Sequence, residues 1–333
     1  MSTTAGVWSE TTLQNVRVRA EALMLDDRIK QQYIPKLDAV NALNAVQTAN
    51  VRPLKDRTKN FTVELEWLNY CGLTVGDTNA CTFGTTEGST NVETKTLDKD
   101  REVTFEVEEY TFKTNDFAYE EAIAKGLLRA DMLICEDFAQ SFVTDLNTGL
   151  GVNLYTGAPG TVAGTTTSIN AADWDYTLYA YLLQVADKNK FTSPVLLNGN
   201  NLYRAFINSQ FAAGNADGKA AAAAFGAMPT YFDIHNLPTV NGASEWSYLL
   251  SMGSWAWASA PKYSDTLEKF QHENRYSFQS RFIPGLWLNV QIQESCANDY
   301  VKWQFKVTSK YGIFPNPTGC SATNTGTLGF LCA

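Results

Sequence analysis

Several kinds of functional residue are scarce in this chain of 333 residues. It has two histidines, His235 and His272, and none of its six cysteines forms a Cys-x-x-Cys pair. Structural zinc sites need these ligands at short, regular spacings, so the sequence predicts no structural zinc. The His-Glu-x-x-His pattern that holds the metal of zinc hydrolases is also missing.

Charged residues and long apolar runs are limited as well. Charged residues make up 18% of the chain, the formal net charge is −9, and no run of Lys and Arg suits a nucleic-acid groove. No apolar run is long enough to cross a bilayer, and the first fifteen residues lack a signal-peptide pattern. We therefore expect a soluble protein that is made in a cytosol and has no membrane partner.

Catalytic patterns are missing too. Neither histidine accompanies a strand, a Gly-x-Ser-x-Gly turn and a helix, so no Ser-His-Asp triad is predicted. Residues 214–219 resemble a phosphate loop, but they have one residue too few between the glycines, and Ala220 stands where Ser or Thr would hold magnesium. The sequence therefore predicts no enzyme, no cofactor and no metal ion.

A long hairpin over residues 60–113 is the most informative pattern that is present. Apolar and polar residues alternate over 61–67 in its first arm and over 103–107 in its second arm, which predicts strands with one apolar and one wet face. The apolar face consists of Phe61, Val63, Leu65, Trp67, Val103, Phe105 and Val107. Because the tip between the arms is long, polar and rich in Gly and Thr, we expect this face to lie on another copy of the chain.

A long helix is predicted over residues 116–147, directly after the hairpin. Asn115 or Asp116 can cap its first turn, and Gly149 can end it. An apolar stripe recurs at helical spacing through Ile123, Leu127, Ile134, Phe138 and Phe142. Such a helix is about 45 Å long, and Cys135 within it is predicted to be a small buried residue.

The rest of the chain is predicted to be helical first and rich in strands later. Residues 1–15 are predicted to form a mobile arm, and the helical pattern from Val16 to Val46 is interrupted by Pro35. Further helices are predicted over 174–188 and after Asn200 or Asn201, with a short strand over 194–197. Later strands are predicted over 231–234, 248–258, 276–283, 286–293 and 301–307, followed by an irregular tail after Tyr311.

This order of parts resembles that of the major capsid proteins of tailed bacteriophages, which have the Hong Kong 97-type fold. The resemblance implies an α+β fold with an N-terminal arm, a long E-loop β-hairpin, a spine helix, a peripheral domain and an axial domain. Residues 61–112 match the E-loop, 117–146 match the spine helix, and 174–211 match the segment that leads into the axial domain. The implied division is 1–59 for the arm with its helices, 60–113 for the hairpin, 114–195 for the peripheral domain with the spine helix 116–147, 196–300 mainly for the axial domain, and 301–333 for a closing strand and tail.

The function implied by the resemblance is structural. Copies would self-assemble into pentamers and hexamers that close into an icosahedral head around double-stranded DNA, which is enclosed without sequence-specific binding. The implied partners are copies of the chain itself and separate scaffolding, portal and decoration proteins. The implied location is the virion, with assembly in the host cytoplasm. Lys95 and Lys99 lie in the region where some members of the family form an isopeptide cross-link, and we assign no role to them.

Two other functions stay open at this point. An encapsulin-like nanocompartment shell has the same fold and would enclose enzyme cargo. A secreted β-rich adhesin or hydrolase would account for the 12% aromatic content and the polar loops, although no signal peptide or catalytic set supports it. A jelly-roll capsid protein is a further alternative, but a helix as long as 116–147 fits that fold poorly.

Four cysteines lie at the extremities of the predicted fold. Cys71 and Cys81 are near the hairpin tip, and Cys320 and Cys332 are in the C-terminal tail. We hypothesise that a thiol of the tip reaches a thiol of the tail of a neighbouring copy and forms a disulfide. Reduced or buried thiols are the alternative, and a cytosolic origin favours them.

Overall fold

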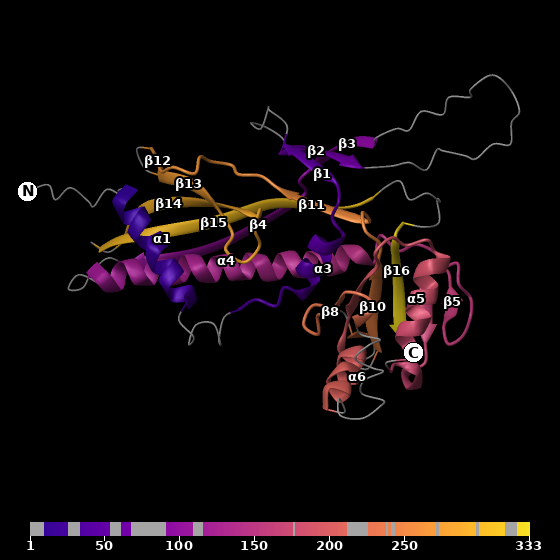
Figure 1. Cartoon of the computed structure of the whole chain (residues 1–333). Coiled ribbons are helices and arrows are strands. Elements are labelled where there is room, and N and C mark those ends of the chain that lie inside the picture. The colour runs from indigo at the N-terminus through magenta and orange to yellow at the C-terminus, as the bar shows by residue number, and fades with distance from the viewer. Residues whose placement is uncertain are drawn as a thin grey trace, which may run out of the picture.

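The protein is elongated, with a long sheet and a long helix in its main body and a second unit at one end (Figure 1). The computed structural model describes residues 10–25, 34–53, 61–67, 91–108, 116–175, 177–211, 226–237, 239–240, 244–270, 273–297, 300–316 and 325–333.

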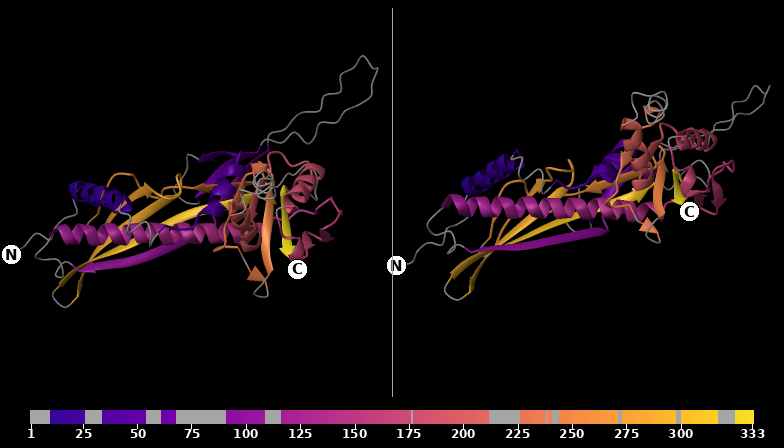
Figure 2. Two further views of the ribbon diagram at one scale, coloured as in Figure 1. Left: turned by 60° about the horizontal axis from the view of Figure 1, so that its bottom comes forward. Right: turned by 90° about the horizontal axis from the view of Figure 1, so that it is seen from below.

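The main body is a six-stranded sheet that packs along one helix. Its strands are β4 (Lys99–Glu108), β11 (Trp255–Ser259), β12 (Glu268–Lys269), β13 (Glu273–Gln279), β14 (Trp287–Ala297) and β15 (Tyr300–Pro315). Helix α4 (Asp116–Leu146) runs along this sheet (Figure 2) and confirms the helix predicted over 116–147. All five residues of the predicted apolar stripe are buried, because their spacing places them on the side of α4 that meets the core.

The second arm of the predicted hairpin belongs to the main body. Strand β4 pairs antiparallel with β15 over its whole length, from Lys99 opposite Tyr311 to Glu108 opposite Lys302. The ring of Phe105 stacks on that of Phe305 at 4.7 Å between centroids, and it lies directly against Gly126 of α4. The prediction that the two arms pair with each other is therefore wrong, since β15 offers β4 a longer partner.

Gly126 allows β4 to approach α4 closely, because a Cβ atom at this position would overlap the Phe105 ring. We expect Gly126→Ala to lower the free energy of unfolding by about 1–3 kcal/mol through overpacking, although Ala is the better helix former. Chemical denaturation measures the change. Adding Phe105→Ala should reduce the cost of Gly126→Ala, and an equal cost in both backgrounds would contradict the explanation.

The first arm of the hairpin lies in a separate three-stranded sheet. Strand β2 (Thr62–Trp67) is at its centre, between β1 (Asn50–Pro53) and β3 (Asn91–Thr96). The paired part of the hairpin runs from Thr62 opposite Thr96 to Trp67 opposite Asn91. The hairpin is thus formed by β2 and β3, and the tip predicted between its arms lies outside the described residues.

The second unit contains a seven-stranded sheet and two helices, α5 (Leu178–Lys188) and α6 (Asn200–Phe211). Its strands are β5 (Thr161–Ala163), β6 (Thr166–Ile169), β7 (Val195–Asn198), β8 (Thr230–Phe232), β9 (Thr239–Val240), β10 (Ser244–Leu250) and β16 (Thr327–Cys332). The last strand, β16, lies between β10 and β6. The prediction of an irregular tail after Tyr311 is therefore wrong at both ends of that segment, because β15 continues to Pro315 and β16 is a buried strand.

Other predicted boundaries also change. Helix α1 (Glu10–Leu25) begins inside the predicted N-terminal arm, whereas residues 1–9 lie outside the described residues. The break at Pro35 is confirmed, since the next described helix is α3 (Asp38–Val46). The helix predicted over 174–188 begins only at α5, after a short 3-10 helix, η2 (Ala171–Asp173).

The largest error among the predicted strands concerns residues 248–258. They form parts of β10 and β11, which belong to different sheets. Between them the chain turns at Gly253, whose φ of +79° is costly for other residues. The sheets consequently divide the chain at other points than the predicted boundaries at 195 and 300. Strands β5 to β10 with β16 build the sheet of the second unit, and β11 to β14 return to the main body.

Candidate functional site

The root of the hairpin is anchored on the main body through one face of β2. Val63, Leu65 and Trp67 are all at most 1% exposed, because period-two alternation turns them toward the same side. They pack in an apolar cluster with Leu97, Ala256, Ala258, Ala260 and Phe314. The small alanine side chains leave room for the indole ring of Trp67, so the root and β11 fit closely.

Burial within the protomer changes the interpretation of the seven predicted interface residues. Val63, Leu65 and Trp67 are already covered by the same chain, and Phe61 packs at the edge of that cluster. Val103, Phe105 and Val107 belong to the core cluster beside α4. These side chains are therefore covered, wholly or in part, by their own protomer, and the contact of this face with a second copy stays a prediction.

The turn into and out of the root is held by local contacts. Phe61 has a φ of +43°, which is unusual for a bulky residue, and its carbonyl accepts a hydrogen bond from the Leu97 amide at 3.0 Å. The ammonium group of Lys310 lies 4.9 Å from the centroid of the Phe61 ring. Leu97 itself is buried. These contacts hold the two ends of the hairpin root together on β15.

We expect Leu65→Ala to loosen the root and lower the free energy of unfolding by about 2–5 kcal/mol, because it leaves a cavity in a fully buried cluster. Denaturant unfolding gives the magnitude, and hydrogen exchange of the β2 and β3 amides shows where protection is lost. Glu64→Ala, on the opposite face of β2, is the matched control and should change little. Equal effects of the two substitutions would contradict the anchoring role of the apolar face.

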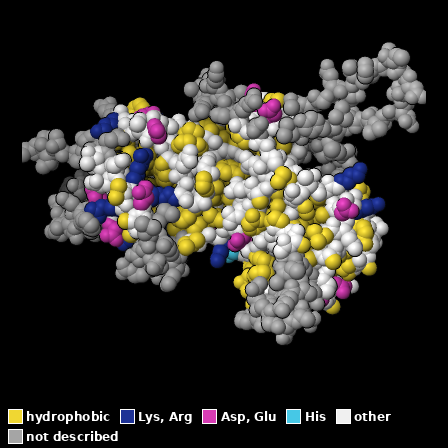
Figure 3. Space-filling view, viewed as in Figure 1, with side chains coloured by type: hydrophobic (Ala, Val, Ile, Leu, Met, Phe, Trp, Pro, Cys, Tyr) yellow, Lys and Arg dark blue, Asp and Glu magenta, His cyan; other side chains and the backbone are white. Residues whose placement is uncertain are grey.

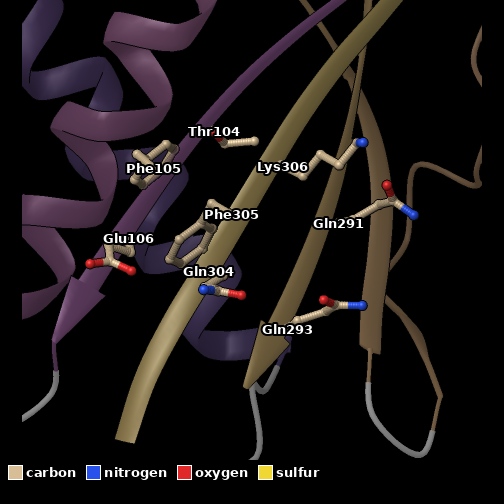
Figure 4. Close-up of a pocket in the computed structure, with 8 residues that line it drawn as sticks. All are labelled: Thr104, Phe105, Glu106, Gln291, Gln293, Gln304, Phe305 and Lys306. Carbon is tan, nitrogen blue, oxygen red and sulfur yellow. The ribbon is translucent and has the colours of Figure 1, made fainter. Parts of the chain in front are cut away.

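The outer face of the main sheet is polar and forms ordered rows of side chains. One row contains Thr104, Lys306, Gln291 and Arg275, and the next contains Glu106, Gln304, Gln293 and Glu273. The same strands turn Phe105 and Phe305 toward the core (Figure 4). An open trough of about 490 Å³ lies among these residues of β4, β14 and β15.

Ion pairs fix the charged side chains of this face. Lys306 pairs with Glu102 at 2.6 Å, and Lys302 pairs with Glu108 at 2.5 Å and with Glu106 at 3.6 Å. The hydrogen bonds from Lys302 to Glu108 and from Lys306 to Glu102 raise the pKa of both lysines. The ladder keeps β4 and β15 in register and presents a face of nearly balanced charge.

A charged aromatic corner borders the trough. Arg275 donates to both carboxylate oxygens of Glu273, at 2.6 and 2.7 Å, and this hydrogen-bonded pair lowers the pKa of Glu273. The guanidinium group lies 4.8 Å from the Phe270 ring centroid and 5.5 Å from that of Tyr263. Phe270 is 54% exposed. This corner combines an oriented cation with an apolar surface, which suits contact with protein.

The other candidate residues do not converge on a chemical centre. Within the described ranges, no three His, Cys, Asp or Glu side chains are grouped to hold a metal ion. His235 is exposed, and its backbone amide donates to Asp233 at 3.1 Å. Lys99 pairs with Asp145 of α4 at 3.1 Å, and Lys95 pairs with Glu93 at 3.1 Å. His272 and the phosphate-loop-like segment lie outside the described residues.

The cysteine hypothesis changes at one position. Cys332 is 5% exposed within β16 and packs in the core of the second unit, so its predicted place in an exposed tail is wrong. The other three cysteines of the hypothesis, Cys71, Cys81 and Cys320, lie outside the described residues. Cys135 is buried on α4, as predicted.

The sequence interpretation missed the pairing of β4 with β15 and the polar rows that result from it. A signal was present, because Lys302, Gln304, Lys306 and Thr308 alternate with Trp303, Phe305 and Val307. Alternation identifies a strand with a polar face, but it does not identify the strand beside it. Among the helices that the structure describes, none has the length and apolar character needed to cross a membrane.

Comparison with known proteins was made by sequence and by structure. No family model and no curated protein matches the sequence. Among solved structures, the capsid structure of the cyanophage P-SCSP1u is 9% identical with a TM-score of 0.45, and the match covers 85% of each chain. The chain is similar to this solved phage capsid structure.

Two further structures illustrate this likeness. The capsid of Ralstonia phage GP4 is 12% identical with a TM-score of 0.41, over 84% of this chain and 86% of that one. The structure of Mycobacterium phage Che8 is 15% identical with a TM-score of 0.44, over 85% of this chain and 92% of that one. The helices and sheets described above confirm the predicted α+β fold class.

Proposed function

We propose that the protein is a major capsid protein of the Hong Kong 97 type, which assembles with copies of itself into a closed shell. The observation that carries the proposal is the hairpin root. Strand β2 is fixed to the main body by buried side chains, and its described pairing with β3 runs from Thr62 opposite Thr96 to Trp67 opposite Asn91. The sequence over 68–90 is polar and rich in Gly and Thr, which suits contact with a neighbouring copy better than a core of its own.

The main body supplies the rigidity that such a shell needs. Helix α4 packs against β4 and β15 through a continuous apolar core. Arg101 of β4 and the Tyr311 hydroxyl of β15 both donate hydrogen bonds to the Asp137 carboxylate of α4, and the Tyr311 oxygen lies 2.9 Å from that carboxylate. The hairpin is joined through β3 and β4 to the sheet that packs on this helix. This connection gives the hairpin a rigid base from which it can contact a neighbouring copy.

The proposed shell is built from pentamers and hexamers. The hairpin of one copy lies on the adjacent copy, where the polar trough and its aromatic corner offer hydrogen bonds and exposed apolar surface. Burial of apolar area at ~25 cal/mol per Å² contributes several kcal/mol to each contact before ordering costs. Each copy touches several others in a closed shell, so contacts of modest affinity together give a stable particle.

Double-stranded DNA is the proposed content of the shell, and the virion is the proposed location. The net charge of −9 supports this content, because an acidic container does not bind the packaged polyanion tightly. Scaffolding, portal and decoration proteins are the proposed additional partners, and the host cytoplasm is the proposed place of assembly. The protein acts by association, and we propose no catalytic role.

Electron microscopy of the purified full-length protein tests the proposal directly. We expect closed shells of uniform diameter, with capsomers of five and six copies visible in class averages. Light scattering on the same sample should show particles far heavier than the 36.8 kDa chain. A monodisperse monomer at high concentration, with and without co-expressed scaffold from the same gene neighbourhood, would argue against a shell protein.

A further inference from the structure

Helix α1 is attached to the main body by few apolar contacts and several polar ones. Among the side chains of α1 whose burial the structure describes, over residues 11–23, the fully buried apolar ones are Leu13, Val16 and Ala20, and Val18 is 59% exposed. It packs on α4 near the start of that helix (Figure 1). The face shown in Figure 3 gathers Lys, Arg, Asp and Glu side chains around this end of the molecule. Because its buried apolar surface is small, α1 depends on its polar contacts to stay packed on α4.

Two residues of the main body, Glu120 and Arg281, each make more than one polar contact with α1. Glu120 of α4 pairs with Arg19 at 2.8 Å and accepts a hydrogen bond from Asn15 at 3.2 Å. Arg281, in the turn between β13 and β14, donates to the Arg17 carbonyl at 3.0 Å and lies 3.6 Å from the Glu21 carboxylate. Arg281 therefore binds the backbone of α1 and pairs with one of its side chains, and Glu120 binds two further side chains of α1.

Beneath α1 the same turn is fixed to α4 by a buried carboxylate. Asp131 is 1% exposed and accepts hydrogen bonds from the Ser280 hydroxyl at 2.6 Å and the Arg281 amide at 3.0 Å. The Cys135 thiol lies 3.4 Å from the same carboxylate. Val16, Arg17 and Ala20 of α1 form one wall of the small cavity that Asp131 borders. Undocking of α1 would open this cavity and hydrate the carboxylate.

We propose that α1 is a releasable latch that covers Asp131 and is held closed by Arg281 and Glu120. The latch can open while α4 and the sheet stay folded, because the ring of Phe138 packs on Trp257 and Tyr311 and that of Phe142 on Trp255, all of them in strands of the main sheet. Opening would free the polar face of α1, with Arg17 and Arg19, for contact with another molecule. The inference goes beyond shell formation, since it concerns a conformational change within one copy.

Ionisation of Asp131 is coupled to the latch. Burial raises the pKa of Asp131, and the hydrogen bonds from Ser280 and Arg281 offset only part of that effect. A raised pKa means that the closed state binds the proton more tightly than the open state does. The closed latch is consequently most stable below the ordinary carboxyl pKa and loosens as the pH rises through the raised value.

The other charged and titratable groups around Asp131 come from each element packed there. They are Arg17 and Glu21 of α1, Cys135 of α4, Tyr276 of β13, and Arg281 of the turn. Burial raises the pKa of both Cys135 and Tyr276, so they stay neutral in the range where the carboxyl titrates. Asp187 is an exposed carboxyl on α5, away from the latch, and it therefore provides a control for the pH response.

Hydrogen exchange of the full-length protein, corrected for intrinsic rates, tests the latch. We expect Arg281→Met to speed exchange of the α1 amides by about tenfold or more while the α4 amides beyond residue 130 keep their protection. Arg204→Met, on exposed surface of α6, is the matched control. Should Arg281→Met fail to fold, Glu120→Gln is expected to give the same selective change. Unchanged α1 protection, or equal loss in α1 and α4, would overturn the proposal.

A second comparison tests the coupling to Asp131. In the unaltered chain, protection of α1 should be greater at about pH 5 than at about pH 8. Asp131→Asn should abolish this difference, because the amide is neutral at both values, whereas Asp187→Asn should retain it. A pH response that survives Asp131→Asn would assign the coupling to another group and remove Asp131 from the latch.

Discussion

Replacement of residues 68–90 by the dipeptide Asn-Gly is expected to abolish closed particles and leave the protomer folded. Trp67 and Asn91 are the last described pair of the hairpin, and a two-residue Asn-Gly turn connects such a pair without strain. The buried face of β2 stays intact, so the thermal midpoint should change by only a few degrees. The shell loses every contact that the tip makes, and small losses at each contact are multiplied over all copies.

Electron microscopy and sedimentation velocity give the result for the shortened hairpin. The matched control keeps the length of the segment but replaces it with a Gly/Ser sequence, which separates reach from side-chain contacts. We expect the control to assemble weakly and the shortened form to remain as free protomers or small capsomers. Closed shells of normal diameter from the shortened form would show that the hairpin tip is dispensable, and the proposed mode of assembly would be lost.

The second large effect is expected at the C-terminal strand. Phe330 lies in β16, between β10 and β6, and its side chain is fully buried in the core of the second unit. Phe330→Ala should lower the free energy of unfolding of that unit by about 3–5 kcal/mol, because it removes a large ring and leaves a cavity. A loss of this size is a large part of the stability of an ordinary domain.

Denaturant unfolding followed by hydrogen exchange locates the effect of Phe330→Ala. Leu331→Ala is the matched control, since it is next in the same strand but points to the other face and is less deeply buried. It should cost about 1 kcal/mol or less. We expect the amides of β6, β10 and β16 to lose protection in Phe330→Ala while those of α4 keep theirs. Equal effects of the two substitutions would mean that β16 is not a core strand.

The sequence alone could have supplied only some of the structural features on which these predictions depend. The hairpin arms were visible from alternation, because Val63, Leu65 and Trp67 share one side of a strand by geometry alone. The long helix was visible for a similar reason, since Ile123, Leu127 and Ile134 recur at helical spacing. Local patterns of this kind depend on a few neighbouring residues, and the structure confirmed both the helix and the strand character of the arms.

Pairing and burial between distant segments were not visible. Alternation in β4 fits any partner strand, and only the folded chain placed Phe105 on Phe305 and against Gly126. The segment after Tyr311 was predicted to be irregular because it is rich in Gly, Thr and Pro, yet Leu328 and Phe330 within it form a strand once β10 and β6 are beside them. The candidate site was the hardest to predict, because its polar rows join β4 to the strands β13, β14 and β15, which come much later in the chain.

The sequence by itself determined the periodic elements, their order along the chain and the scarcity of groups for metal or covalent chemistry. Tertiary structure alone decided that the apolar hairpin face is a buried root, that Cys332 is inaccessible, and that α1 rests on a buried carboxylate. The reason is physical: periodicity is a property of neighbouring residues, whereas burial and ionisation depend on what the rest of the chain brings into contact.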